Sequence, residues 1–271
     1  MGETGPSANP FEPPTAALEQ PRTRPPGEMG PLARFLGVFT SPGKTFASIA
    51  RFPGKDWLFP AGLAFVISLT FGLVASSKVD VDQAVAKAME QVEKRGDLPE
   101  EQRVRIEEMQ RKGMEFFVHK GLPIFTALAP ILVLLIVSGL WHGIAAAFGV
   151  KTTYRRALTG AAYAQSINIL KGAVALPIML SRPTLDLEQM GTIVKSNVGA
   201  FLSADASPVF RALATTWDVF DFWTLAVSVI AVSHVTRFKT GGAVAVVLTL
   251  WFLYVCLAVG GAAFGVAMGG G

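Results

Sequence analysis

The sequence predicts an all-α integral membrane protein with five transmembrane helices and an extramembrane helical hairpin. Hydrophobic residues make up 51% of its 271 residues and charged residues 16%, against about 25% charged in ordinary soluble domains. Five apolar stretches each reach the roughly 20 residues that a bilayer core requires. Backbone groups in lipid need internal partners, so these stretches should be helices. We place the spans at Trp57–Ser76, Gly121–Phe148, Thr159–Leu180, Thr216–Val235 and Gly242–Met268.

The first 31 residues differ sharply from the rest. Met1–Pro31 is rich in Pro, Gly, Glu and Thr, and offers too little apolar surface to offset the entropy of ordering. We expect a disordered, Pro-rich cytoplasmic tail that precedes a membrane domain at 32–268. The first apolar stretch begins near Trp57, which is too late for a cleavable signal peptide.

The segment that follows, Pro31–Lys55, is short and amphipathic. It contains Phe and Leu residues with basic residues around them: Arg34, Lys44, Arg51 and Lys55. We expect it to lie along the membrane surface with Phe and Leu inward and basic groups toward lipid headgroups. An equally good interpretation is a cytoplasmic helix packed on the bundle.

The hairpin is predicted at 78–118, between the first two spans. Asp82–Arg95 and Leu98–Lys112 both favour helices, and their mixed charges are typical of a solvated face. The short loops Val150–Leu158 and Thr236–Gly241 are basic and contain no acid. Because the positive-inside rule applies best to short loops, we predict a cytoplasmic N-terminus and an extracytoplasmic C-terminus.

Polar residues interrupt the third span in a regular way. Gln165, Asn168 and Lys171 are spaced by three, so they form one slanted stripe on a helix. Such a stripe could line an intramembrane path for a solute or a lipid headgroup. The simpler interpretation is hydrogen bonding between helices, with Lys171 reaching an interface.

Asp218 and Asp221 open the fourth span, one turn apart, among aromatic residues. As a pair they could bind a cation or a proton, and so belong to the same polar path. The simpler interpretation is that the helix dipole stabilises carboxylates at this N-terminus.

Small residues recur four apart at Gly139–Gly143, Gly261–Gly265 and Gly265–Gly269. Such patterns let helix backbones approach closely in lipid. Packing within the chain is the favoured interpretation, and a homo-oligomer through the small-residue faces is the alternative.

Other functions find little support. Gly43-Lys44-Thr45 lacks the upstream glycine of a phosphate-binding loop, because position 38 is Val. The three histidines lack zinc-site spacing, and hydrolase and zinc-protease motifs are missing. A single cysteine excludes an intramolecular disulfide. We therefore expect no enzyme activity, no cofactor and no metal. The net charge of +4 reflects the basic excess of membrane proteins, so we expect no nucleic-acid partner.

Three segments together resemble the Yip1 family, specifically its bacterial members. They are Phe35–Ala50 followed by Trp57-Leu58-Phe59-Pro60, Thr153–Leu158 running into Ala161–Ala164, and Trp217–Trp223 before a glycine-containing last helix. The resemblance covers residues 32–268 and implies five helices, a cytoplasmic N-terminus and a place in the bacterial inner membrane. Eukaryotic relatives are associated with vesicle trafficking and Rab-type GTPases. This chain lacks their Asp-Leu-Tyr-Gly-Pro motif, so GTPase binding is not carried over.

Within the second resembling segment, Tyr154, Arg155 and Arg156 are candidates for lipid or partner contact, because Arg binds phosphates and Tyr bridges apolar and wet layers. We predict a non-enzymatic organiser of membrane proteins or lipids. The alternative is a small permease or channel component that uses the polar residues of the third span. A water-filled pocket there would favour transport, and a dry bundle would favour the organiser.

Overall fold

A computed structural model describes residues 27–93, 96, 99–203 and 206–269. The described residues form helices joined by short connections, with two isolated β-bridges, Val79 with Leu185 and Asn197 with Asp218. Most of the predicted tail, residues 1–26, lies outside the described part of the chain.

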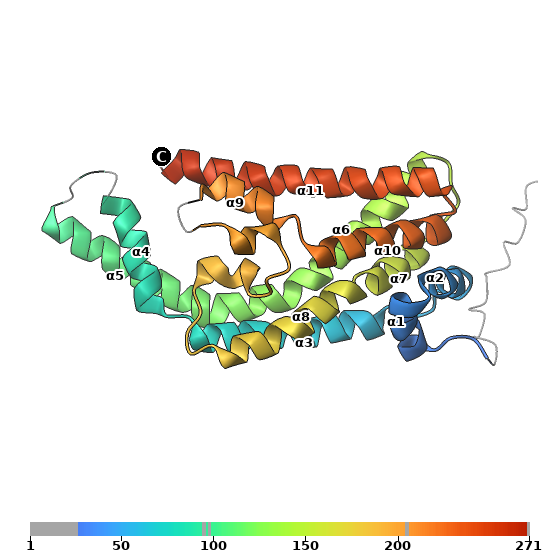
Figure 1. The fold of residues 1–271 in the computed structure, drawn as a ribbon, viewed down its shortest axis with the longest axis horizontal. Coiled ribbons are helices and arrows are strands. Elements are labelled where there is room, and N and C mark those ends of the chain that lie inside the picture. The colour runs from blue at the N-terminus through green and yellow to red at the C-terminus, as the bar shows by residue number, and fades with distance from the viewer. Residues whose placement is uncertain (1–26, 94–95, 97–98, 204–205, 270–271) are drawn as a thin grey trace, which may run out of the picture.

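Five helical segments are long and apolar enough to cross a membrane, which confirms the predicted fold class. They run side by side in an elongated bundle, with short helices at one end and the hairpin projecting at the other (Figure 1). The crossing helices are α3 (Leu58–Lys78), α6 (Leu122–Ala147), α7 (Tyr154–Ala164) continued by α8 (Ser166–Ser181), α10 (Val219–Thr236) and α11 (Thr240–Gly269).

Close packing of α3 against α6 rests on a glycine. A Cβ added at Gly72 would collide with Thr126 Oγ1 and lie 2.8 Å from Pro123 Cα. On the other side of the bundle, a Cβ at Gly160 of α7 would lie 2.8 Å from a methyl carbon of Val235 in α10. Small residues therefore let these helices approach closely, as is usual in lipid.

The glycines of the small-residue patterns have a different environment. A Cβ added at Gly139, Gly143, Gly261 or Gly265 would meet no atom within 4 Å among the described residues. The prediction that these patterns pack helices within the chain is therefore wrong for these four positions. Sequence spacing marks small residues but not the helix face that meets a neighbour.

The predicted amphipathic segment forms two helices at the N-terminal end, α1 (Pro31–Thr40) and α2 (Pro42–Arg51). Both pack on the bundle: Val38, Phe46 and Ile49 are buried in its main apolar cluster. The cluster also contains residues of α7 and α10, so this end is held by tertiary packing.

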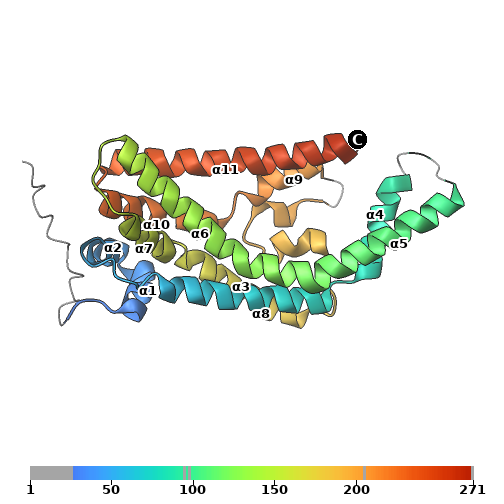
Figure 2. The ribbon, with the colours of Figure 1, turned by 180° about the vertical axis from the view of Figure 1, so that it is seen from behind.

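The hairpin consists of α4 (Val81–Glu93) and α5 (Glu100–Phe116). The second helix does not end before the membrane, because a π-helical turn, η1 (Phe117–Gly121), joins α5 to α6. The second helix of the predicted hairpin and the predicted second span are therefore parts of one continuous helical segment, Glu100–Ala147. Figure 2 shows this helix passing from the bundle into the hairpin.

The long connection between α8 and α10 folds back onto the bundle. It contains two short 3₁₀ helices, η2 (Leu187–Thr192) and η3 (Val198–Phe201), and the helix α9 (Pro208–Thr215). Helix α9 packs on η3 and on α11, and Figures 1 and 2 show the described part of the connection lying between α8 and α11. It covers the bundle on the side where α10 begins.

Candidate functional site

Lys171 of α8 reaches across to the start of α10. Its Nζ lies 2.8 Å from Asp218 Oδ2 and 4.0 Å from Asp221 Oδ1. The predicted stripe on the third span and the predicted acidic pair on the fourth therefore meet in one charged cluster. Their sequence separation of 47 residues gives no sign of this contact.

Asp218 is fully enclosed and well satisfied. Its side chain is 0% exposed, and its carboxylate also accepts hydrogen bonds from Ser196 Oγ at 2.7 Å and from the Phe220 backbone N–H at 2.8 Å. The bond to Phe220 is an N-cap of α10. Asp218 thus caps a helix, joins two spans and anchors the connection that contains Ser196.

The other two residues of the stripe continue the polar line. Asn168 Nδ2 donates to Gln165 Oε1 at 2.6 Å, and Thr224 Oγ1 of α10 donates to Asn168 Oδ1 at 3.5 Å. Gln165 is the residue at which α7 ends and α8 begins. Polar groups from the third and fourth spans therefore face each other, with Asn168 on the exposed side of this contact.

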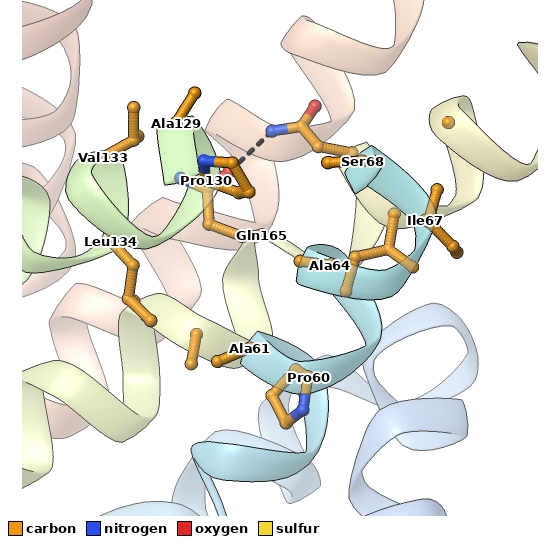
Figure 3. A pocket seen from close by; sticks show the side chains of 14 residues that line it. Pro60, Ala61, Ala64, Ile67, Ser68, Ala129, Pro130, Val133, Leu134 and Gln165 are labelled. Carbon is orange, nitrogen blue, oxygen red and sulfur yellow. Dashed lines mark hydrogen bonds between the residues drawn. The ribbon is translucent and has the colours of Figure 1, made fainter. Parts of the chain in front are cut away.

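Two cavities adjoin this polar line. The smaller, about 240 Å³, lies between α3, α6 and the α7–α8 junction. Figure 3 shows its α3 side chains on one side and those of α6 on the other, with Gln165 between them. The larger, about 490 Å³, is an open groove between α6, α10 and α11. Gln165, Asn168 and Val133 line both cavities.

The groove combines an apolar body with a polar wall. Leucine, isoleucine and valine residues of α6, α10 and α11 form most of its lining, together with Trp141, Trp251 and Tyr254. Asp221, Thr224, Gln165 and Asn168 supply polar groups. Helix α11 is mostly exposed on its outer side, so the groove opens sideways to the surrounding lipid.

The three candidates for lipid or partner contact lie at the start of α7. Arg155 is exposed and Arg156 is half-buried. Tyr154 turns partly into the bundle, where its Oη accepts a hydrogen bond from Ser138 Oγ at 3.1 Å and its ring meets His142 edge to face. Arg155 is therefore the candidate best placed for an external ligand.

A buried arginine is the main feature that sequence reasoning missed. Arg34 was expected to face headgroups, but it is 0% exposed. Its guanidinium lies 2.7 Å from Asp56 Oδ2 and donates to the Phe52 carbonyl at 2.9 Å and to Ser48 Oγ at 3.0 Å. Asp56 is the one acid in the sequence between Glu28 and Asp80. That isolated acid, close to an amphipathic segment, is the sequence feature that could have predicted the buried ion pair.

Further hydrogen bonds fasten this region to α7. Tyr163 is buried, and its Oη donates to the Pro31 carbonyl at 3.2 Å and to the Asp56 carbonyl at 3.4 Å. Thr159 Oγ1 donates to the Pro53 carbonyl at 2.8 Å. We use the name N-terminal module for α1, α2, residues 52–57 and the N-terminal half of α7.

Across the described ranges, no group of three or more His, Cys, Asp or Glu side chains is arranged to hold a metal ion. Among the described residues, the polar wall of the groove has one carboxylate, that of Asp221, and several neutral groups.

Comparison with known proteins gives one match. A family model for the Yip1 domain matches residues 36–261, which include α3, α6, α7, α8 and α10, most of α11 and the charged cluster. No curated protein and no solved structure matches the chain.

Proposed function

The chain belongs to the Yip1 family of multi-pass membrane proteins, and from this premise we propose that it is a non-enzymatic organiser of membrane lipids or membrane proteins. The main support for this proposal is the basic surface of the N-terminal module and the adjoining loops. Its exposed cations are Lys44, Arg51, Lys55, Lys151, Arg155, Arg237 and Lys239.

Acidic groups do little to neutralise this surface. The described acids at this end are Glu28, which accepts a hydrogen bond from Ser48, and Asp56, which pairs with Arg34. A clustered basic surface next to a bilayer attracts anionic headgroups with about 1 kcal/mol per Lys or Arg. It would equally attract an acidic segment of another membrane protein.

Helix α1 supports an orientation of this surface toward the bilayer. Leu32 is 59% exposed and Leu36 is 56% exposed, whereas Arg34 is buried. An exposed apolar face beside exposed cations is the arrangement of a helix at a membrane interface. The basic short loops favour the cytoplasm, so we propose that this end lies at the cytoplasmic side of a bacterial inner membrane, with the C-terminus outside.

The test is extraction in native-lipid nanodiscs, followed by mass spectrometry of co-purifying lipids and proteins. Lys151→Ala/Arg155→Ala should lower the enrichment of anionic lipid or of a specific membrane protein severalfold, because two surface cations are lost. Arg105→Ala/Lys112→Ala removes the same charge from exposed hairpin positions and should leave the enrichment unchanged. Extraction of the wild-type protein alone in bulk lipid would refute the organiser.

A permease or channel component is the second candidate, favoured by the Gln165–Asn168 pair that lines both cavities. Its test is release of entrapped glycerol and rubidium from proteoliposomes. A transport role predicts release above that of empty liposomes, lowered by Asn168→Ala. Equal release from empty, wild-type and variant vesicles would exclude both solutes.

A further inference from the structure

The charged cluster at the start of α10 contains more negative than positive charge. Lys171 supplies one cation, and Asp218 and Asp221 supply two carboxylates. The ammonium is 2.8 Å from Asp218 and 4.0 Å from Asp221, so Asp218 is its main partner. The charge of Asp221 is left poorly matched within the described part of the chain.

Asp221 is also the residue of the cluster that faces the groove. Its side chain is 31% exposed, and it is the sole charged side chain lining the groove among the described residues. A carboxylate within a membrane span is costly unless a proton or a cation offsets its charge. A positively charged ligand at the groove wall would therefore lower the energetic cost of the Asp221 carboxylate.

The groove offers aromatic surfaces to such a partner. Trp141 of α6 and Trp251 of α11 line the groove. The centroid of the Phe222 ring lies 6.1 Å from that of Trp251, so the two rings pack together. Tyr254 lines the groove one turn further along α11. Aromatic faces attract organic cations, and the attraction reaches about 2 kcal/mol when water is excluded.

The remaining lining limits the kind of cation. Most of it is aliphatic, whereas a calcium ion takes six to eight oxygen ligands and a magnesium ion keeps several waters. A volume of about 490 Å³ lies within the range of small-molecule sites. The sideways opening toward lipid admits ligands that already partition into the bilayer.

We propose that this groove binds an amphiphilic organic cation, with its positive centre at the Asp221 carboxylate and its apolar groups against Trp141, Trp251 and Tyr254. This inference goes beyond the proposed function, because the groove is separate from the basic cytoplasmic surface. Thr224 and Asn168 provide hydrogen-bonding groups beside the positive centre.

The test is equilibrium dialysis of the full chain in phosphatidylcholine nanodiscs against tetraphenylphosphonium, with empty discs subtracted. Tetraphenylborate is the matched control, because it has the same four phenyl groups and the opposite charge. We expect saturable binding of the phosphonium ion and none of the borate. Asp221→Asn should weaken phosphonium binding about tenfold or more.

Three further variants separate the site from general effects. Glu107→Gln makes the same charge change on the hairpin and should bind normally, as should Lys151→Ala/Arg155→Ala on the cytoplasmic surface. Trp251→Leu/Tyr254→Leu should lose phosphonium binding, and it replaces Asp221→Asn as the test if that variant does not fold. Equal uptake of the two ions, or unchanged binding by the folded groove variants, would overturn the proposal and leave the groove to acyl chains.

Discussion

Two arginine–aspartate pairs lie at opposite ends of the molecule and have opposite surroundings. In the N-terminal module, the Arg34 side chain is 0% exposed and that of Asp56 is 15% exposed. In the hairpin, Arg111 is 42% exposed and its partner Asp82 is 77% exposed. Water screens the second pair and is excluded from the first. The comparison shows that burial, rather than contact, decides what an ion pair contributes.

The two regions also differ in how their helices use charge. Helix α5 has no buried described residue. Its ion pairs either cross to α4, as Arg111 with Asp82, or lie along its own surface, as Glu108 with Lys112. The hydrogen bond from Lys112 lowers the pKa of the Glu108 carboxyl. Helix α1 does the reverse, with its arginine toward the protein and its leucines outward. Which face of a helix bears its charged residues therefore depends on whether that face meets water, protein or lipid.

The largest expected effect comes from breaking the buried pair. Arg34→Met would leave the Asp56 carboxylate and the carbonyls of Ser48 and Phe52 without the guanidinium that binds them. Loss of one partner from a buried pair typically costs about 3–5 kcal/mol. Thermal unfolding in detergent, followed by fluorescence-detected size-exclusion chromatography, should show a large fall in the melting temperature.

Its control removes both charges. Arg34→Met/Asp56→Asn should recover part of the lost stability, since no uncompensated carboxylate remains. Arg34→Lys should also be destabilised, because an ammonium cannot reproduce the planar fork of donors. An unchanged melting temperature for Arg34→Met would show that the N-terminal module does not depend on this pair.

A smaller effect is expected at the charged cluster, where Lys171 is 28% exposed. A double-mutant cycle with Lys171→Met and Asp218→Asn should give a favourable coupling energy of about 1–3 kcal/mol. The measurement is thermal or detergent-induced unfolding of the four proteins. Additive effects would mean that the Lys171–Asp218 contact contributes nothing to stability. This pair would then resemble the exposed Arg111–Asp82 pair of the hairpin.

The smallest effect is expected at the hairpin. Arg111→Ala removes an exposed pair that water and salt already screen, so the melting temperature should not change measurably at any ionic strength. The same unfolding assay checks this in low and high salt. A clear, salt-sensitive loss of stability would contradict the comparison, because it would show that exposure alone does not predict how much an ion pair contributes to stability.

Much of the fold could be predicted because it depends on local composition. The five spans follow from stretches that match the thickness of a bilayer, and α3 and α10 end within three residues of their predicted limits. The continuity of α5 with α6 could not be predicted. Gly121 and the charged residues before it resemble a helix boundary, but the backbone passes through them as a π-helical turn.

The candidate site could be predicted in its parts but not in its assembly. Lys171, Asp218 and Asp221 stand out as ionisable residues in or beside spans. Their meeting depends on how α8 and α10 are rotated and shifted against each other. The same holds for the close contacts of Gly72 and Gly160, which depend on the helix faces that meet.

The sequence by itself determined that the chain is a helical membrane protein, because its apolar stretches have the length of spanning helices and backbone groups in lipid must be paired internally. Its three resembling segments indicated the Yip1 family. Only the tertiary structure decided that Arg34 points inward, that the acidic pair meets Lys171, and that Asp221 faces a groove. Those outcomes depend on which helix faces touch. Helix contacts in lipid are set by the fit of particular side chains rather than by a hydrophobic pattern.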